Sequence, residues 1–114
     1  MMNYMAIPGL QRKGQVKEIG KTTVQIMNIV CNYYDMTADE LLRKKRHRVY
    51  VKPRQQFFYL CWFFDTEPLL KLSEKLGYNH ATMIWGRKVV MNEMSYNRLI
   101  KNQINEMVEI IRQT

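Results

Sequence analysis

A dense run of cationic side chains lies between residues 43 and 54 and contains no acidic residue. Its members are Arg43, Lys44, Lys45, Arg46, Arg48, Lys52 and Arg54. These seven cations nearly equal the formal net charge of +8, so the net positive charge is concentrated in one segment. Such a patch attracts polyanions and speeds their encounter, and a nucleic-acid backbone has the matching charge density. The apolar Val49 and Val51 inside the run indicate a loop attached to a folded domain, because a disordered basic tail is expected to be polar throughout.

A second group of polar residues follows a predicted turn in the second half of the chain. Gly77 and Tyr78 separate an apolar segment, residues 69–76, from a helical pattern that begins at Asn79 and runs to about Met91. Two helices joined by a short glycine turn are typical of a helix-turn-helix, whose second helix enters the major groove of DNA. The first residues of that second helix are therefore candidate base contacts.

The candidate base contacts are Asn79, His80 and Thr82. Asparagine pairs with adenine through two hydrogen bonds, and threonine offers a methyl group to thymine. Lys88 lies further along the same predicted helix, where it would contact phosphate. The cationic run is long enough to place an arginine in the adjacent minor groove, whose potential is more negative where the groove narrows. A solvated loop and a polar helix cap remain the alternative interpretations of the run and of His80.

Capping residues and apolar spacing predict the helices that position these groups. Helical spacing begins at Thr22 and ends before Asp35. Thr37 and Glu40 fit the capping box of a short helix that leads into the cationic run. Pro53 is expected in the first turn of a central helix, which should be surrounded by other helices because apolar residues occupy all its faces. Those residues are Phe57, Phe58, Tyr59, Leu60, Cys61, Trp62, Phe63 and Phe64.

The end of the chain is predicted to be one further helix with Ser95 as its N-cap. Its expected apolar stripe comprises Leu99, Ile100, Ile104, Met107, Val108 and Ile111. Gly86 costs about 0.5–1 kcal/mol relative to alanine inside a helix, so we expect a neighbouring helix to approach closely there. Trp62 and Trp85 are expected to pack inside the domain, and exposure of either would instead favour a protein interface, because tryptophan is enriched at binding hot spots. Residues 1–20 carry glycine, proline and scattered cations, and they are expected to form a flexible or weakly ordered arm.

The composition is that of one globular domain: 114 residues, 46% hydrophobic and 25% charged. Cys31 and Cys61 lie in apolar stretches without a Cys-x-x-Cys pair, so we expect buried, reduced thiols. No apolar run has the length of a membrane span and no signal-peptide pattern is present, so a cytoplasmic, nucleoid-associated protein is expected. No catalytic constellation, metal-ligand cluster or cofactor motif is recognisable, so we expect no enzyme, no metal and no cofactor.

Several sequence features, in a fixed order, resemble the C-terminal DNA-binding domain (domain IV) of the bacterial replication initiator DnaA. They are Tyr33-Tyr34, the segment Thr37 to Leu42, the run Arg43 to Arg48, the triplet Pro53-Arg54-Gln55, and the segment Gly77 to Met83. The resemblance extends from Val24 to Met91. It implies an all-α, Trp-repressor-like helix-turn-helix bundle of about five or six helices with a basic loop, which we assign to residues 21–114.

The resemblance also implies roles for individual residues. Arg46 resembles the arginine that enters the minor groove. Arg54 and Gln55 would hold the DNA backbone, and His80 and Thr82 would line the major groove. Together with the charge pattern, this predicts phosphate contacts from Arg43, Lys44, Lys45, Arg48, Lys52, Arg54, Gln55 and Lys88.

The recognition tip departs from the family pattern. Tyr78 to Thr82 reads Tyr-Asn-His-Ala-Thr where the family usually has Arg-Asp-His-Thr-Thr, and the turn before it is one residue shorter. Aspartate accepts from cytosine N4 whereas asparagine prefers adenine, so we expect a shift in the DNA sequence that is read. The chain has no Gly-x-x-x-x-Gly-Lys-Ser/Thr phosphate loop, so nucleotide-driven initiation is not expected of it.

These observations predict a sequence-preferring protein that binds double-stranded DNA and resembles an origin-binding domain without its ATPase. We expect a monomer or weak oligomer, with replication proteins as candidate further partners and no membrane partner. The alternative is a non-catalytic, protein-binding adaptor or competitor in replication control that has lost sequence-specific DNA reading.

Overall fold

The computed structural model describes residues 22–43 and 48–114, and within them the chain forms six helices. They are α1 (Thr23–Tyr34), α2 (Ala38–Leu42), α3 (Arg48–Phe63), α4 (Leu69–Leu76), α5 (His80–Tyr96) and α6 (Arg98–Gln113). The all-α helix-turn-helix prediction is confirmed. The arm predicted for residues 1–20 and three of the predicted DNA contacts, Lys44, Lys45 and Arg46, lie outside the described residues.

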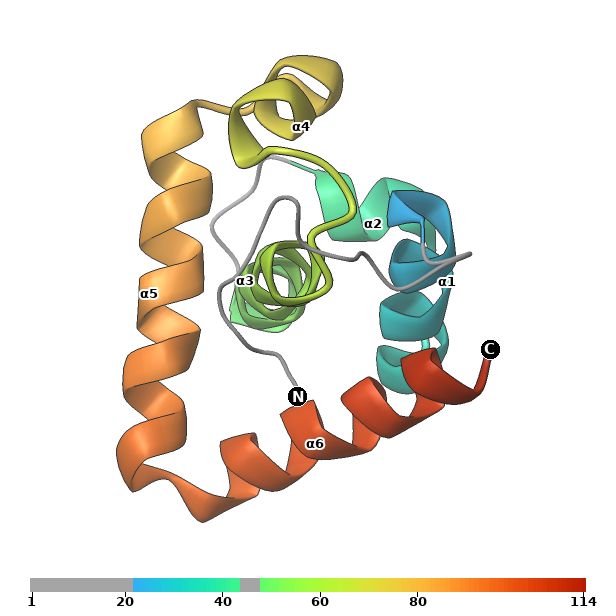
Figure 1. Ribbon diagram of the computed structural model, residues 1–114, viewed down its shortest axis with the longest axis vertical. Coiled ribbons are helices and arrows are strands. Elements are labelled where there is room, and N and C mark those ends of the chain that lie inside the picture. The colour runs from blue at the N-terminus through green and yellow to red at the C-terminus, as the bar shows by residue number, and fades with distance from the viewer. Residues whose placement is uncertain (1–21, 44–47) are drawn as a thin grey trace.

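Helix α3 lies at the centre of the bundle. Figure 1 shows it nearly end-on, with α5 along one side, α1 on the other and α6 across the base. Helices α5 and α1 both pack against α3, and α6 packs against α5 and α1. The core is therefore built around Phe57, Phe58 and Leu60 of α3, which are almost fully buried.

The helix starts follow local capping rules. Thr22 and Gln25 form a capping box at the start of α1, and Thr37 and Glu40 form the predicted one at the start of α2. Helix α1 ends at Asp35, whose φ of 54° is in the left-handed region, so the chain turns sharply into α2. The predicted boundaries of both helices are confirmed.

The start of α3 differs from the prediction. Pro53 is the sixth residue of α3 and not part of its first turn, because the helix begins at Arg48. Pro53 has no N–H group, so the hydrogen bond that this position would donate to the carbonyl of Val49 is missing from α3. The second half of the cationic run, from Arg48 to Arg54, is therefore helical.

The junction of the last two helices also differs from the prediction. Helix α5 continues to Tyr96, beyond the expected end near Met91, so Ser95 lies inside it and is not a cap. Asn97 is the N-cap of α6, and its Oδ1 accepts hydrogen bonds from the N–H groups of Leu99 and Ile100. Asn97 thus ends α5 and starts α6 with a single residue between them.

Three apolar residues of α3 and α6 that were expected to be covered are exposed. Trp62 is 39% and Phe63 is 42% exposed, because both lie in the last turn of α3, where the surrounding helices no longer enclose it. Leu99, in the first turn of α6, is 64% exposed. The guanidinium of Arg87 covers Trp62, with its Cζ atom 4.5 Å from the ring centroid. The remaining apolar predictions for α3 and α6 are confirmed.

Both cysteine thiols are free and buried, as predicted. Burial raises the pKa of the Cys61 thiol, so the thiol stays protonated and unreactive in the folded protein. Among the described helices, none has both the length and the apolar character needed to cross a membrane.

Candidate nucleic-acid interface

Helices α4 and α5 form the helix-turn-helix. Helix α4 ends at Gly77, whose φ of 74° is in the left-handed region that favours glycine. The backbone N–H of Tyr78 donates to the carbonyl of Ser73 at 2.9 Å, which closes the turn. Asn79 then starts α5, which turns away from α4 along the side of the bundle (Figure 1). The predicted turn and the predicted start of the second helix are both confirmed.

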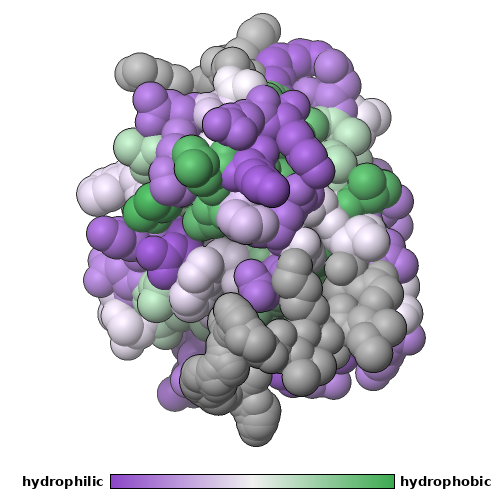
Figure 2. All heavy atoms as spheres, turned by 45° about the horizontal axis from the view of Figure 1, so that its top comes forward, coloured by the Kyte–Doolittle hydropathy of each residue, from purple (hydrophilic) through white to green (hydrophobic). Residues whose placement is uncertain are grey.

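The outer surface of α4 is mostly polar, with Leu70 as an exposed apolar residue. Its exposed residues include Lys71, Glu74 and Lys75, and Lys75 forms an ion pair with Glu67 at 2.7 Å. Figure 2 shows a largely hydrophilic face toward this end of the molecule, with small separate apolar patches. The cations of this surface suit a first helix that crosses a phosphate backbone.

The tip of α5 presents polar side chains to solvent. Asn79 and Thr82 are exposed, and His80 is half-buried. The Asn79 Oδ1 accepts the N–H of Ala81 at 2.8 Å, so Asn79 caps the helix. This bond uses one of the two lone pairs on Oδ1 and leaves the amide Nδ2 available as a donor. The helix N-terminus also carries partial positive charge, which favours an approaching phosphate.

Side chains from α3 and from the turn converge on the end of α2. The Arg54 Nε donates to the carbonyl of Leu41 at 2.9 Å, and its Nη2 donates to the carbonyl of Arg43. The hydroxyl of Tyr78 donates to the carbonyl of Leu42. The Arg54 Cζ lies 5.8 Å from the centroid of the Tyr78 ring. Arg43, the first cation of the run, is therefore held beside the turn that immediately precedes Asn79.

The predicted site residues of α3 occupy three different environments. Arg54 is only 8% exposed and its guanidinium bonds within the domain. Lys52 is exposed and forms an ion pair with Glu93 of α5 at 2.5 Å. Gln55 packs against α5 at Gly86. The side chain of Arg48 is not among those described. Their predicted DNA contacts stay predictions.

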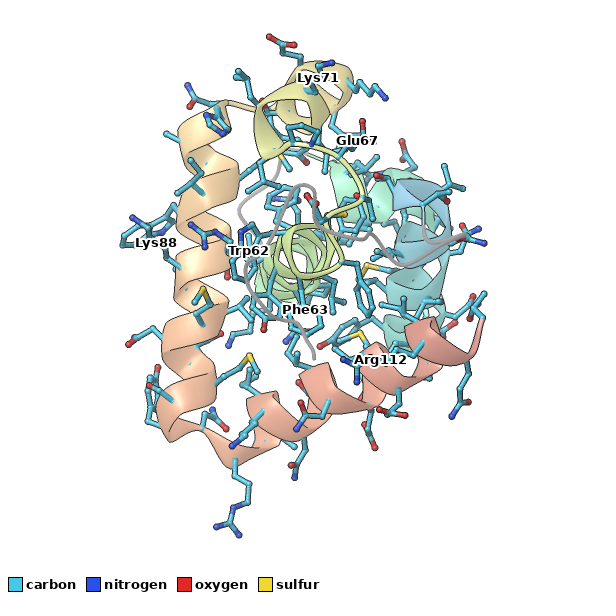
Figure 3. All side chains as sticks on the ribbon, in the orientation of Figure 1. Trp62, Phe63, Glu67, Lys71, Lys88 and Arg112 are labelled. Carbon is cyan, nitrogen blue, oxygen red and sulfur yellow. The ribbon has the colours of Figure 1, made fainter. Side chains whose placement is uncertain are left out.

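Distances along α5 separate its predicted contacts into two groups. Lys88 follows His80 by eight residues, about 12 Å at 1.5 Å per residue. Its exposed side chain points away from α3 (Figure 3). Glu93, the partner of Lys52, is about 20 Å from His80 along the helix by the same rise. The structure thus brings Arg43 close to the tip, while Lys52 and Lys88 lie further along the helix.

One candidate contact was missed in the sequence. Trp85 is 65% exposed, although packing inside the domain was expected. It follows Thr82 by three residues and is therefore its neighbour on the helix surface. The buried Met83, Gly86 and Val90 lie on the other side of Thr82, toward the core. The spacing from Thr82 was the signal available in the sequence.

Within the described residues, no group of three or more histidine, cysteine, aspartate or glutamate side chains is arranged to hold a metal ion. The chemistry of this surface is therefore that of cations, amide and hydroxyl groups and one large aromatic ring. Such groups bind and orient an anionic polymer.

Comparison with known proteins gives a consistent result. A family model described as "Bacterial dnaA protein helix-turn-helix" matches residues 23–90. The chromosomal replication initiator protein DnaA of Corynebacterium jeikeium is 31% identical over 88 residues, which is 76% of this chain and 15% of the relative. The corresponding protein of Lacticaseibacillus casei is 31% identical over 102 residues, 89% of this chain and 22% of the relative. The chain thus spans less than a quarter of the length of these relatives.

Proposed function

The chain belongs to the bacterial DnaA helix-turn-helix family, and from that membership we propose that it binds double-stranded DNA with α5 in the major groove and its cationic run on the adjacent backbone. Family membership itself describes a DNA-binding helix-turn-helix domain that resembles the origin-binding domain of DnaA. The adaptor alternative is not favoured by this match. The contacts of individual residues and the DNA sequence that they read belong to the proposal.

The position of Arg43 carries the proposal. Arg54 and Tyr78 bind the carbonyls around it, so the start of the cationic run is fixed beside the turn that leads into α5. A protein that reads bases while it neutralises phosphates needs both groups on one side of the molecule, within one groove width of each other. This arrangement supports simultaneous contact with a single duplex.

We assign base contacts to the tip of α5 and backbone contacts to the run. Asn79, His80 and Thr82 face the major groove, and Arg46 enters the adjacent minor groove. Phosphates are contacted by Arg43, Lys44, Lys45, Arg48, Lys52, Gln55 and Lys88. Because Oδ1 of Asn79 already accepts the N–H of Ala81, its Nδ2 is the better placed group, and it pairs with an acceptor such as N7 of a purine.

The sequence that is read is proposed to differ from the standard initiator box. Asn79 is a donor where the related tips have an aspartate acceptor, and Ala81 offers only a methyl group. Trp85 extends the contact surface by one helical turn on the face of Thr82. We propose that the domain binds origin-like sites of this altered sequence, where it recruits replication proteins or competes with them.

Selection from a random duplex pool, followed by anisotropy titrations at 50 to 200 mM salt, tests the proposal. Six to ten phosphate contacts lower the affinity about 10³- to 10⁵-fold over that range. Arg46→Ala is expected to weaken binding to the selected and scrambled duplexes alike, while His80→Ala weakens binding to the selected duplex only. Arg112→Ala, at the far end of α6, is the charge-matched control. Salt-independent or undetectable binding of the parent chain would contradict the proposal.

A further inference from the structure

Three consecutive carbonyl groups at the end of α2 accept hydrogen bonds from other parts of the fold. Leu41 and Arg43 accept from the guanidinium of Arg54 on α3, and Leu42 accepts from the hydroxyl of Tyr78 in the turn between α4 and α5. The acceptors thus end one element, and the donors belong to two others that are distant in sequence.

We propose that Tyr78 and Arg54 are positioning residues that fix the start of the cationic run against the recognition helix and so set the spacing between backbone and base contacts. This inference rests on the proposed DNA-binding function. It assigns Arg54 a role inside the domain, in place of the phosphate contact expected from the sequence.

Helix α2 needs such support because it is short. It has five residues, and an isolated helix of that length is not stable in water. The last carbonyls of a helix have no partner within it, and the chain leaves α2 at Arg43 in an extended conformation with φ −66° and ψ 130°. The orientation of the backbone at Arg43 is therefore determined by the groups that bind these carbonyls.

The two donors are themselves held firmly. The Tyr78 ring packs edge-on against Phe58 of the core, with ring centroids 5.4 Å apart and an interplanar angle of 72°. The guanidinium carbon Cζ of Arg54 lies 5.8 Å from the centroid of the Tyr78 ring, and Arg54 is only 8% exposed. A cation so deeply buried must keep its hydrogen bonds, since leaving it unpaired is costly. Through these contacts the packed core restrains the backbone at Arg43.

Tyr78 also connects the two halves of the interface. It is the residue directly before Asn79, the cap of α5, and its hydroxyl reaches Leu42, directly before Arg43. Removing that hydroxyl leaves both helices intact but releases the link between the tip and the run. The backbone at Arg43 must then be fixed when DNA binds, which lowers affinity.

Tyr78→Phe in the full chain tests the inference, with Tyr96→Phe as the matched control because Tyr96 is an exposed tyrosine at the far end of α5. The first measurement needs no DNA: the rate of trypsin cleavage between residues 43 and 48, located by mass spectrometry. The rate should rise in Tyr78→Phe and stay at the parent value in Tyr96→Phe. Affinity for the selected duplex should fall about three- to tenfold, as expected for one lost hydrogen bond.

Arg54→Lys separates positioning from direct contact. Lysine keeps the charge but cannot bind two carbonyls in the fork geometry of arginine. A positioning role predicts faster cleavage and weaker binding, whereas a phosphate contact predicts an unchanged cleavage rate and nearly unchanged affinity. Unchanged cleavage in both variants overturns the inference whatever the DNA result. A parent chain that binds no duplex would overturn the proposed function, and accelerated cleavage in Tyr78→Phe would still uphold the positioning of the run.

Discussion

Gly86 of α5 lies so close to Phe58 of α3 that a Cβ atom added to the glycine would be 3.2 Å from Cδ2 of the phenylalanine. The same Cβ would be 3.3 Å from Cγ of Gln55. The close approach that the sequence predicted at this glycine is confirmed. The crossing of α3 and α5 determines how the recognition helix is presented, so this contact links the core to the interface.

Gly86→Val should therefore destabilise the fold. The branched side chain has to displace the buried Phe58, and overpacking of this kind costs about 1–3 kcal/mol of unfolding free energy. Gly86→Ala is the graded control. The better helix propensity of alanine contributes about 0.5–1 kcal/mol and opposes a smaller packing strain, so the free energy of unfolding should change by no more than about 1 kcal/mol. Urea unfolding followed by circular dichroism measures both. A valine variant as stable as the parent would show that the two helices separate easily.

Glu93→Gln should strengthen DNA binding. The substitution breaks the ion pair that holds Lys52 and removes a negative charge from the side of α5 that faces α3. This ion pair is partly exposed, so its loss should cost about 1 kcal/mol of stability and leave the fold intact. We expect tighter binding at low salt, with the slope of log affinity against log salt steeper by about one. Glu109→Gln on α6 is the control. Equal slopes for the two variants would show that Lys52 is not part of the DNA interface.

Trp85→Ala should weaken DNA binding without unfolding the protein. If DNA covers about 60 Å² of the exposed indole, the loss is about 1.5 kcal/mol at 25 cal/mol per Å², or about tenfold in affinity. Stability should change by no more than about 0.5 kcal/mol, as for most surface substitutions. Trp62→Phe, at the exposed end of α3, should leave the affinity unchanged. Loss of affinity in the Trp62 variant alone would show that DNA binds on the side of α5 next to Trp62 and not on the side of Trp85.

Tyr33→Phe should change how stability responds to alkaline pH. Partial burial, followed by the hydrogen bond to Glu106 and its charge, raises the pKa of Tyr33 to about 12 from an ordinary value of 10. A pKa raised by folding means that the stabilisation is fully present below pH 10 and is lost as the pH rises toward 12. The stability difference between parent and variant should therefore shrink across that interval. Urea midpoints that remain parallel from pH 9 to 12 would show that Tyr33 does not contribute.

Local chemistry explains which parts of this fold are predictable from the sequence. The capping box at Thr37 and Glu40, the turn at Gly77 and the cap at Asn79 depend on residues no more than five apart, and all are confirmed. Pro53 was wrongly assigned to the first helical turn, because α3 begins five residues earlier, at Arg48.

The remaining differences come from tertiary contacts. Ser95 and Asn97 are both good caps, and only the packing of α6 on α5 and α1 selects Asn97. Trp62, Phe63 and Trp85 are apolar residues of the kind that fill cores, but all three are exposed. Trp62 and Phe63 lie in the last turn of α3, and Trp85 lies on the outer side of α5. The hydrogen bonds that Arg54 makes inside the domain could not be predicted from its place in the sequence, because their acceptors are backbone carbonyls at the end of α2.

Chemical-shift mapping of the ¹⁵N-labelled chain during titration with the selected duplex tests the central claim most directly. If the cationic run and the tip of α5 bind one duplex together, the amide signals of residues 44–46 and 79–82 will shift in parallel and saturate at the same DNA concentration. Signals from the outer face of α6 will stay in place. Shifts confined to one of the two groups, or centred on Trp62 and Phe63, would contradict a shared DNA-binding surface.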